Sequence, residues 1–260
     1  MSLPLFSIAH TTARPERWRA SYDSWIARAV NPEQVEYILC CDEKWGFVPV
    51  TSDLVDWLNL RNEKNALIWN EGPKSSTSGW NRAAVASTGG IIILNADDMR
   101  PPHGWDKDLL RAIAGKDPLK DEFVVHVACG GTADQRGLII LQILSRARYE
   151  RLGYALFPLY ESMYSDDEFT LSAQLDGCYI DARHLRWNHG HPFNNGGDLD
   201  EVYRHQNRPQ AYETGRKLFE ERRAAGFPPL SSSGSSDSSG SDSIDMVRPS
   251  EPISSLNPSR

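Results

Sequence analysis

The sequence predicts an α/β fold in which helices flank a mostly parallel sheet, followed by a less regular second half. Over residues 1–130, short apolar runs alternate with segments of helical spacing, which is typical of parallel strands connected by helices. Three of these runs end in polar clusters, and such sheets bind ligands beyond the carboxyl ends of their strands. The chain has 260 residues, of which 40% are hydrophobic, so it can build a sizeable core.

The first elements lie before residue 45. An apolar run predicts a strand over Leu5–Ala9, and Pro15 then suits the first turn of a helix that continues to about Ala29. Apolar residues recur at helical spacing in that helix, namely Trp18, Tyr22, Trp25 and Ile26. The run Val35–Cys41 predicts a buried strand that ends at Asp42.

The next segment leads to a pair of acids. Residues 48–57 indicate a loop and a short helix, and Ala66–Trp69 a strand. Gly79–Ser87 predicts a helix with small residues on one side, which ends before Gly89 and Gly90. Ile91–Leu94 is too short for a helix and rich in β-branched residues, so we expect a strand there, ending at Asn95-Ala96-Asp97-Asp98.

Beyond this point the pattern becomes less regular. We expect a helix over Trp105–Ala114, a strand over Phe123–Ala128 and either state for Leu138–Ile143. Asp166–Gln174 indicates a helix and Gly177–Asp181 a strand, and a charged helix follows over about residues 201–225.

Three parts follow from this reading. Residues 1–130 are expected to form a regular α/β half, and residues 131–228 a less regular half of the same domain. Residues 229–260 are dominated by Ser, Gly, Asp and Pro, a composition that predicts a disordered tail.

Composition narrows the function classes. The formal net charge of −7 disfavours a broad basic face for nucleic acid. The four cysteines include no CxxC pair, which disfavours a thiolate zinc site. The N-terminus lacks the pattern of a signal peptide, and no apolar run approaches the roughly 20 residues of a membrane helix. We therefore expect a cytoplasmic protein without a membrane segment.

Asp97 and Asp98 are the most informative pair of side chains. Two carboxylates at a strand end suit Mg²⁺ or Mn²⁺, which commonly take one or two carboxylates together with phosphate oxygens. Asp-Asp near Pro101 and Pro102 is also good turn chemistry. From the local sequence alone, a metal site and a turn both remain open.

A longer pattern surrounds this pair. The stretch SGWNRAAVASTGGIIILNADDMRPPHGW (78–105) resembles the central motif of family 2-like GT-A glycosyltransferases: a small-residue helix with an Asn, a Gly, an apolar strand and an Asp-x-Asp signature followed by Pro. FSIAHTTARPERW (6–18) looks like that family's first strand and nucleotide-binding loop, and VEYILCCDE (35–43) like its second strand. The resemblance covers about residues 5–110 and implies a GT-A-like, Rossmann-related fold. It further implies that residues 1–130 are the nucleotide-sugar-binding half and residues 131–228 the acceptor-binding and catalytic half.

The resemblance also implies a donor site for a nucleoside-diphosphate sugar, with a UDP-sugar as the first expectation. Asp42 would meet the nucleotide base and Asp97 the metal, with Asp98 beside it. Asn95 replaces the first acid of Asp-x-Asp, and its amide can still bond a ribose hydroxyl. The remaining residues expected to contact the nucleotide are His10, Thr12, Arg14 and Asn81.

A second acidic cluster, Tyr164-Ser165-Asp166-Asp167-Glu168-Phe169, follows at the place where similar enzymes carry a catalytic base. A carboxylate that touches the acceptor can remove the proton of its hydroxyl. Asp167 is the first choice, with Glu168 and Asp166 as the alternatives. Acids also favour the first turn of a helix, so a structural role is the competing interpretation.

His189 and His191 form a third cluster in WNHGHP. An imidazole can complete a metal shell or donate to phosphate, and similar glycosyltransferases supply a late His for this purpose. We expect one of the two to contact the metal or the diphosphate, although close His pairs are also common in loops. Trp80 and Trp105 flank the proposed site in sequence and could stack on sugar.

Two other functions compete with transfer of a sugar. A nucleotidyltransferase usually opens with a Gly-rich phosphate loop, and HTTARPERW contains no glycine. A binding module without turnover is supported only by Asn95. The layout also looks like small stand-alone glycosyltransferases, some phage-encoded and acting in the host cytoplasm, in some of which the acceptor is a hydroxymethylated DNA base. Arg146, Arg148 and Arg151 could supply a basic face for DNA modification, while glycan, lipid-linked and protein acceptors remain equally open.

Overall fold

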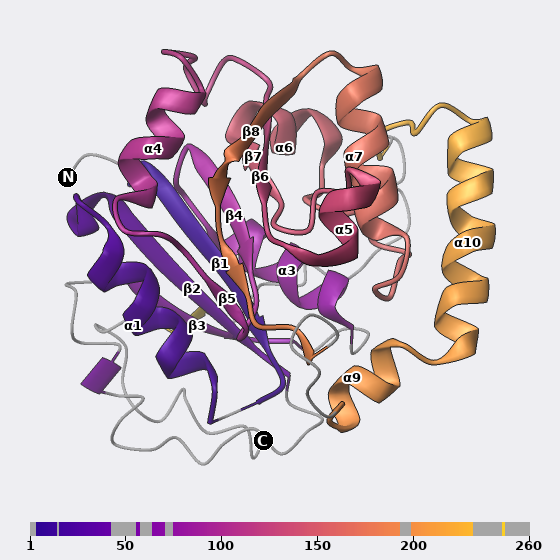
Figure 1. The fold of residues 1–260 in the computed structure, drawn as a ribbon, viewed down its shortest axis with the longest axis horizontal. Coiled ribbons are helices and arrows are strands. Elements are labelled where there is room, and N and C mark those ends of the chain that lie inside the picture. Colours follow the sequence, from indigo (N-terminus) through magenta and orange to yellow (C-terminus); the bar gives the residue numbers. More distant parts are fainter. Residues whose placement is uncertain are drawn as a thin grey trace, which may run out of the picture.

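A computed structural model describes residues 4–14, 16–42, 56–57, 64–70, 75–192, 199–230 and 246–247. Its centre is a mixed sheet in the order β10-β3-β2-β1-β4-β7-β6-β8 (Figure 1). The strands span β1 Phe6–Thr12, β2 Val35–Cys41, β3 Asn65–Trp69, β4 Ile91–Asn95, β6 Val124–Ala128, β7 Ile143–Ser145, β8 Tyr179–Arg186 and β10 Met246–Val247. The α/β class with a mostly parallel sheet is thereby confirmed.

The sheet places three chain segments at one edge. β1 lies between β2 and β4 and runs parallel to both. Parallel neighbours end on the same side, so Ala13, Asp42 and Ala96 follow three adjacent strands at one edge of the sheet. β7 is antiparallel to β4 and to β6, which makes the sheet mixed.

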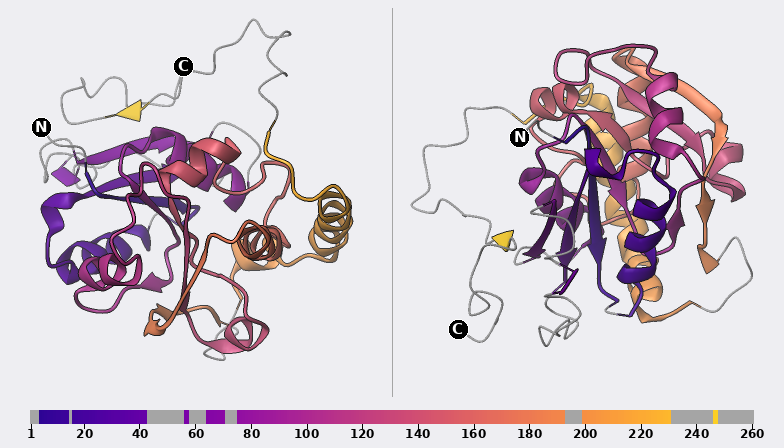
Figure 2. Two further views of the ribbon diagram at one scale, coloured as in Figure 1. Left: turned by 90° about the horizontal axis from the view of Figure 1, so that it is seen from above. Right: turned by 90° about the vertical axis from the view of Figure 1, so that its left-hand side faces the viewer.

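Helices cover both faces of the sheet, as the two views of Figure 2 show. On one face, the aromatic residues of α1 (Trp18–Arg28) and α4 (Trp105–Ala112) pack on every second sheet residue. On the other face, α3 (Ser76–Ala86) and α7 (Ser165–Leu175) pack on the alternate residues. Alternation of side chains along each strand produces the two cores.

The remaining elements are short, apart from the last helix. They are η1 Pro32–Gln34, β5 Met99–Arg100, α5 Gly131–Arg136, α6 Arg146–Leu152, β9 Asn188–His189, α9 Glu201–Gln206 and α10 Pro209–Ala224. β5 and β9 form a separate two-stranded ribbon. No described helix combines the length and apolar character needed to cross a membrane.

Small residues let α3 approach β1 closely. A Cβ on Gly79 would lie 1.9 Å from the Thr11 hydroxyl oxygen, so this position needs glycine. At its N-terminus, Ser75 accepts a hydrogen bond from the Ser78 amide, a typical helix cap. The expected small-residue helix is therefore present, three residues longer at its start than the sequence indicated.

One expectation needs correction. The charged helix expected over residues 201–225 is broken into α9 and α10 at Asn207 and Arg208, because Pro209 has no amide hydrogen and restricts the residue before it. In the segment expected to be a tail, Met246–Val247 pairs antiparallel with β3. Most of residues 231–260, and most of the expected loop over residues 48–57, lie outside the described residues.

Candidate functional site

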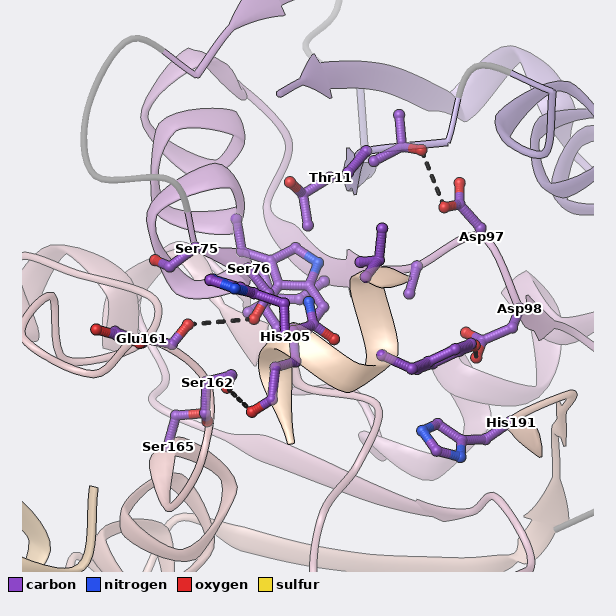
Figure 3. Close-up of a pocket in the computed structure, with 18 of the residues that line it drawn as sticks. Thr11, Ser75, Ser76, Asp97, Asp98, Glu161, Ser162, Ser165, His191 and His205 are labelled. Carbon is purple, nitrogen blue, oxygen red and sulfur yellow. Dashed lines mark hydrogen bonds between the residues drawn. The ribbon is translucent and has the colours of Figure 1, made fainter. Parts of the chain in front are cut away.

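A pocket opens at the carboxyl ends of β1, β2 and β4 (Figure 3). Its first side is formed by the segments that follow these strands, including Arg14, Asp42 and Asp98. Its second side comes from the start of α3, the segment before α7 and α9, and is rich in hydroxyl groups. Thr12, Asp97, Asp166, His189 and His191 also line it, so eight of the site residues expected from the sequence meet around one cavity.

Asp97 borders the pocket but is held firmly by the protein. Its Oδ1 lies 3.0 Å from Nε2 of His10, and its Oδ2 accepts the Thr12 hydroxyl at 2.9 Å. Arg14 Nη1 is 3.5 Å from the same Oδ2. With only 4% of the residue exposed, both oxygens of Asp97 are engaged by neighbours.

Asp98 presents a carboxylate beside a histidine. The β5–β9 ribbon pairs Met99 with His189, and the Gly190 amide donates to the Asp98 carbonyl oxygen at 2.8 Å. This brings His189 Nε2 to 3.4 Å from Asp98 Oδ2. Burial opposes ionisation, yet hydrogen bonds with His189 and Tyr203 hold the pKa of Asp98 well below its usual range. Asp98 is therefore a carboxylate at neutral pH.

His191 lies next to this pair. Its ring centroid is 5.3 Å from that of His189 and 4.6 Å from that of Tyr203. Burial, and then the nearby His189, lower the pKa of His191 below its ordinary value. A neutral imidazole can serve as a ligand or a hydrogen-bond donor, which makes His191 a candidate for metal or phosphate contact.

Arg14 links the first side of the pocket to α9. Its guanidinium donates to Asp200 from Nε at 2.7 Å and from Nη2 at 3.0 Å, and it lies 4.3 Å from the Tyr203 ring centroid. Burial works against its charge, but the hydrogen bond to Asp200 raises the pKa of Arg14. Neither Asp200 nor Tyr203 was expected from the sequence, although the Asp-x-x-Tyr spacing of a helix cap was a signal for α9.

Three residues expected to contact the nucleotide do not line the pocket. His10 is fully buried between Tyr37 and Asp97, so it orients Asp97. Asn95 is also fully buried, and its amide bonds the side chains of Trp25, Ser21 and Tyr37, which leaves none of it for a ribose. The carboxamide of Asn81 bonds backbone groups of residues 155–156 and does not line the pocket.

The acidic cluster is divided among three environments. Of its acids, only Asp166 lines the pocket, where Gln142 Nε2 donates to its Oδ1 at 2.6 Å. Burial, reinforced by the nearby Asp167, raises the pKa of Asp166 to about 7. Asp167 pairs with Arg136 at the surface, and Glu168 is buried against Arg222 and Tyr160. Glu168 does not line the pocket, which argues against its expected catalytic role.

The second side of the pocket carries hydroxyl and amide groups. Ser75, Ser76, Ser162, Ser165, Gln206 and an Arg208–Glu161 ion pair line it (Figure 3). Trp80 also lines the pocket, with its indole nitrogen donating to the Asn95 carbonyl oxygen at 2.7 Å. Trp105 instead lies fully buried in the core against Trp25, so of the two tryptophans singled out only Trp80 can meet a sugar.

The arginines considered for a DNA-binding face are engaged within the protein. Arg148 is fully buried and pairs with Glu122 and Asp176. Arg146 donates to the carbonyl oxygen of Gly89, and Arg151 pairs with the same two acids as Arg148. These three side chains therefore hold the second half of the fold together.

Structural comparisons identify the fold. S. aureus TarS 1–349 matches with a TM-score of 0.56 at 14% identity, over 86% of this chain and 74% of that one. The same TarS fragment in complex with UDP-GlcNAc gives a TM-score of 0.60 at 12% identity, over 83% of this chain and 65% of that one. The mannosyltransferase PcManGT from Pyrobaculum calidifontis, in complex with GDP-Man and Mn²⁺, gives a TM-score of 0.53 at 16% identity, over 86% of this chain and 76% of that one.

Neither the protein-family models nor the curated protein sequences that were searched give a match to this chain. The mostly parallel sheet flanked by helices matches the fold of these solved structures. The chain therefore has the GT-A fold of these glycosyltransferases.

Proposed function

We propose that this protein is a metal-dependent glycosyltransferase that moves a sugar from a nucleoside-diphosphate sugar to an acceptor hydroxyl. The observation that carries the proposal is one pocket, in a GT-A fold, lined by the Asp98–His189 pair and by the partly buried acid Asp166. The solved structures similar to this chain include one named with UDP-GlcNAc and one named with GDP-Man and Mn²⁺. A UDP-sugar is our first choice of donor.

The donor set fits a metal that is shared with a diphosphate. Within the described ranges, no group of three or more His, Cys, Asp or Glu side chains could hold a metal ion by itself. Asp98 and His189 offer one carboxylate and one imidazole, and Mn²⁺ or Mg²⁺ commonly takes its other ligands from phosphates and water. We assign the metal contact to Asp98 in preference to Asp97, because both oxygens of Asp97 are engaged.

A bound metal would neutralise the diphosphate and improve it as a leaving group. Arg14 supplies a further positive charge at the same side, and we assign Asp42, which also lines the pocket, to the nucleotide base. Asp166 accepts the proton of the acceptor hydroxyl while the oxygen of that hydroxyl bonds to the anomeric carbon of the sugar. The bond from that carbon to the β-phosphate oxygen breaks, and its electron pair leaves with the nucleoside diphosphate.

For the acceptor, the serine-rich second side suits a molecule that presents hydroxyl groups, such as a glycan. A hydroxymethylated DNA base is less well supported, because the arginines considered for DNA are held in ion pairs and backbone contacts. A nucleotidyltransferase would form a different product from a glycosyltransferase, and a binding module would form none.

A donor screen tests this function. Purified protein is incubated with common UDP-, GDP- and TDP-sugars with and without Mn²⁺, and released nucleoside diphosphate is measured. We expect slow, Mn²⁺-dependent release from one donor, at least about a hundredfold reduced in Asp98→Asn. Asp108→Asn, which changes an acid on α4 paired with Arg111, is the matched control.

Two results would contradict the proposal. Release of pyrophosphate from a nucleoside triphosphate and a sugar phosphate would identify a nucleotidyltransferase. Tight, saturable binding of a donor with no turnover in the presence of varied saccharide acceptors would identify a binding module.

A further inference from the structure

Tyr203 contacts three charged or ionisable residues on the first side of the pocket. Its hydroxyl donates to Asp98 Oδ2 at 2.6 Å, and its ring centroid lies 4.3 Å from Cζ of Arg14. The third residue is His191, whose ring centroid is 4.6 Å from that of Tyr203. Tyr203 is 5% exposed and lines the pocket, so these contacts are sheltered from water.

The helix that carries Tyr203, α9, is itself bonded to Arg14 on the first side of the pocket. Asp200 caps α9 by accepting the Tyr203 amide at 3.0 Å, and the same carboxylate takes both hydrogen bonds from Arg14. Arg14 is thus held between an acid and an aromatic face of one helix. A change in the Tyr203 side chain therefore reaches Arg14 and Asp98 together.

The contact to Asp98 leaves room for a ligand. Among the hydrogen bonds and ion pairs of the described residues, the two that reach this carboxylate, from Tyr203 and His189, both go to Oδ2. Oδ1 receives none of these contacts from the described residues, so we assign it to the cation, while the bonded Oδ2 fixes the carboxylate plane. Partners of this kind, which hold a metal ligand without touching the metal, commonly set its affinity.

We propose that Tyr203 is a positioning residue of the donor site, holding the Asp98 carboxylate through its hydroxyl and the Arg14 guanidinium through its ring. This inference rests on the proposed function, because it assigns Asp98 to the metal and Arg14 to the diphosphate. The hydroxyl and the ring of Tyr203 thus have different tasks. Tyr203→Phe removes the hydroxyl alone, and Tyr203→Leu removes the ring as well.

Removal of the hydroxyl alone is the first test. In Tyr203→Phe the ring over Arg14 stays, so UDP binding without metal should be nearly unchanged. The affinity for Mn²⁺ in the presence of UDP should fall about tenfold, as expected when a group that orients a metal ligand is lost. Free Mn²⁺ is measured by its electron paramagnetic resonance signal and UDP by isothermal titration calorimetry, with GDP as the second nucleotide probe.

Removal of the ring is the second test. Tyr203→Leu should weaken Mn²⁺ binding similarly and also weaken metal-free UDP binding several-fold, because Arg14 loses the face that holds it. The matched control is Tyr212→Phe. Tyr212 is an exposed residue of α10 whose hydroxyl donates to Asn207 Oδ1, and neither residue lines the pocket. Thermal unfolding of all variants shows whether a loss of binding follows a loss of folded protein.

The outcomes separate the two levels of the proposal. Wild-type protein that binds neither nucleotide with Mn²⁺ would contradict the proposed function. If wild-type protein binds and Tyr203→Phe binds Mn²⁺ equally well or more tightly, the function stands and the positioning role is overturned. Equal losses in Mn²⁺ and metal-free UDP binding for Tyr203→Phe would also overturn it, because the hydroxyl would then have no separate task.

Discussion

Asp166 combines burial with a position on the pocket wall. Its pKa is raised to about 7 because the charged form loses hydration, and Gln142 offsets part of that loss by donating a hydrogen bond. A carboxyl group with such a pKa exchanges protons near neutral pH, which suits a general base. The neighbouring Asp167 has the same charge but faces Arg136, so one residue of helical rotation separates a pocket acid from a surface acid.

At the residue scale we predict opposite effects of Asp166→Asn on activity and stability. Transfer should fall by about 10²–10⁴-fold, because the base is lost. In the wild type, kcat/KM should rise with pH and level off above about 7, where Asp166 is deprotonated. Steady-state kinetics across pH 5–9, with the donor that the screen identifies, measure both effects.

The stability effect follows from the same raised pKa. The folded protein favours the protonated acid, so the stability that Asp166 contributes is fully present below its unfolded pKa of about 4 and is lost as pH rises through about 7. Asp166→Asn should therefore raise the melting temperature at pH 8. Asp167→Asn is the control, and a larger loss of activity there would reassign the base to Asp167.

At the element scale, a buried ion pair joins α7 to α10. Arg222 donates to Glu168 at 2.7 Å and also bonds the Tyr154 hydroxyl, while Glu168 accepts the Tyr160 hydroxyl at 2.9 Å. Gly215 allows the close packing, since a Cβ there would lie 2.4 Å from the Met163 carbonyl oxygen. This contact supports the start of α7 and hence the position of Asp166.

We predict that Glu168→Ala lowers the free energy of unfolding by about 3–5 kcal/mol, because it leaves Arg222 buried without its partner. Urea unfolding at pH 7 measures the change. The double variant Glu168→Leu with Arg222→Met should recover much of that stability, since neither charge is then left buried alone. If the single variant binds the donor nucleotide as wild type does while folded, the role of Glu168 is structural. A selective loss of kcat at unchanged stability would return it to the catalytic candidates.

At the scale of the whole molecule, the net charge and the positions of the arginines both disfavour duplex DNA as the acceptor. The chain has a net charge of −7, and two of the three clustered arginines, Arg146 and Arg148, are buried. Binding to duplex DNA depends on exposed cations that replace condensed counterions. The serine side chains on the second side of the pocket are instead suited to an acceptor that carries hydroxyl groups.

We therefore predict that duplex DNA containing hydroxymethylated bases binds no more tightly than about 10⁻⁴ M at physiological salt. Fluorescence anisotropy of a labelled duplex, titrated with the protein at low and physiological salt, measures this. Unmodified duplex of the same sequence is the control. Saturable micromolar binding that depends on the modified base would restore DNA as the acceptor.

Much of the fold could be predicted from the sequence because its causes are local. The apolar run Val35–Cys41 forms a strand with the expected bounds, and the strand expected at Ile91–Leu94 extends by one residue. Short apolar runs bury on both faces of a parallel sheet whatever their distant neighbours are. Asp97 and Asp98 were located for the same reason, since they follow such a strand.

The tertiary structure decided which polar side chains face the pocket. Asn95 ends the strand expected to bear a ligand contact, yet it points into the α1 core, and His10 turns toward Asp97. Asp166 and Glu168 are two residues apart on one helix and face different surroundings. Strand pairing, helix rotation and the packing of α9 fix these directions through contacts between residues far apart in the chain. The sequence alone therefore determined where the candidate site lies, and long-range packing determined that Asp98, Asp166 and Tyr203 line it.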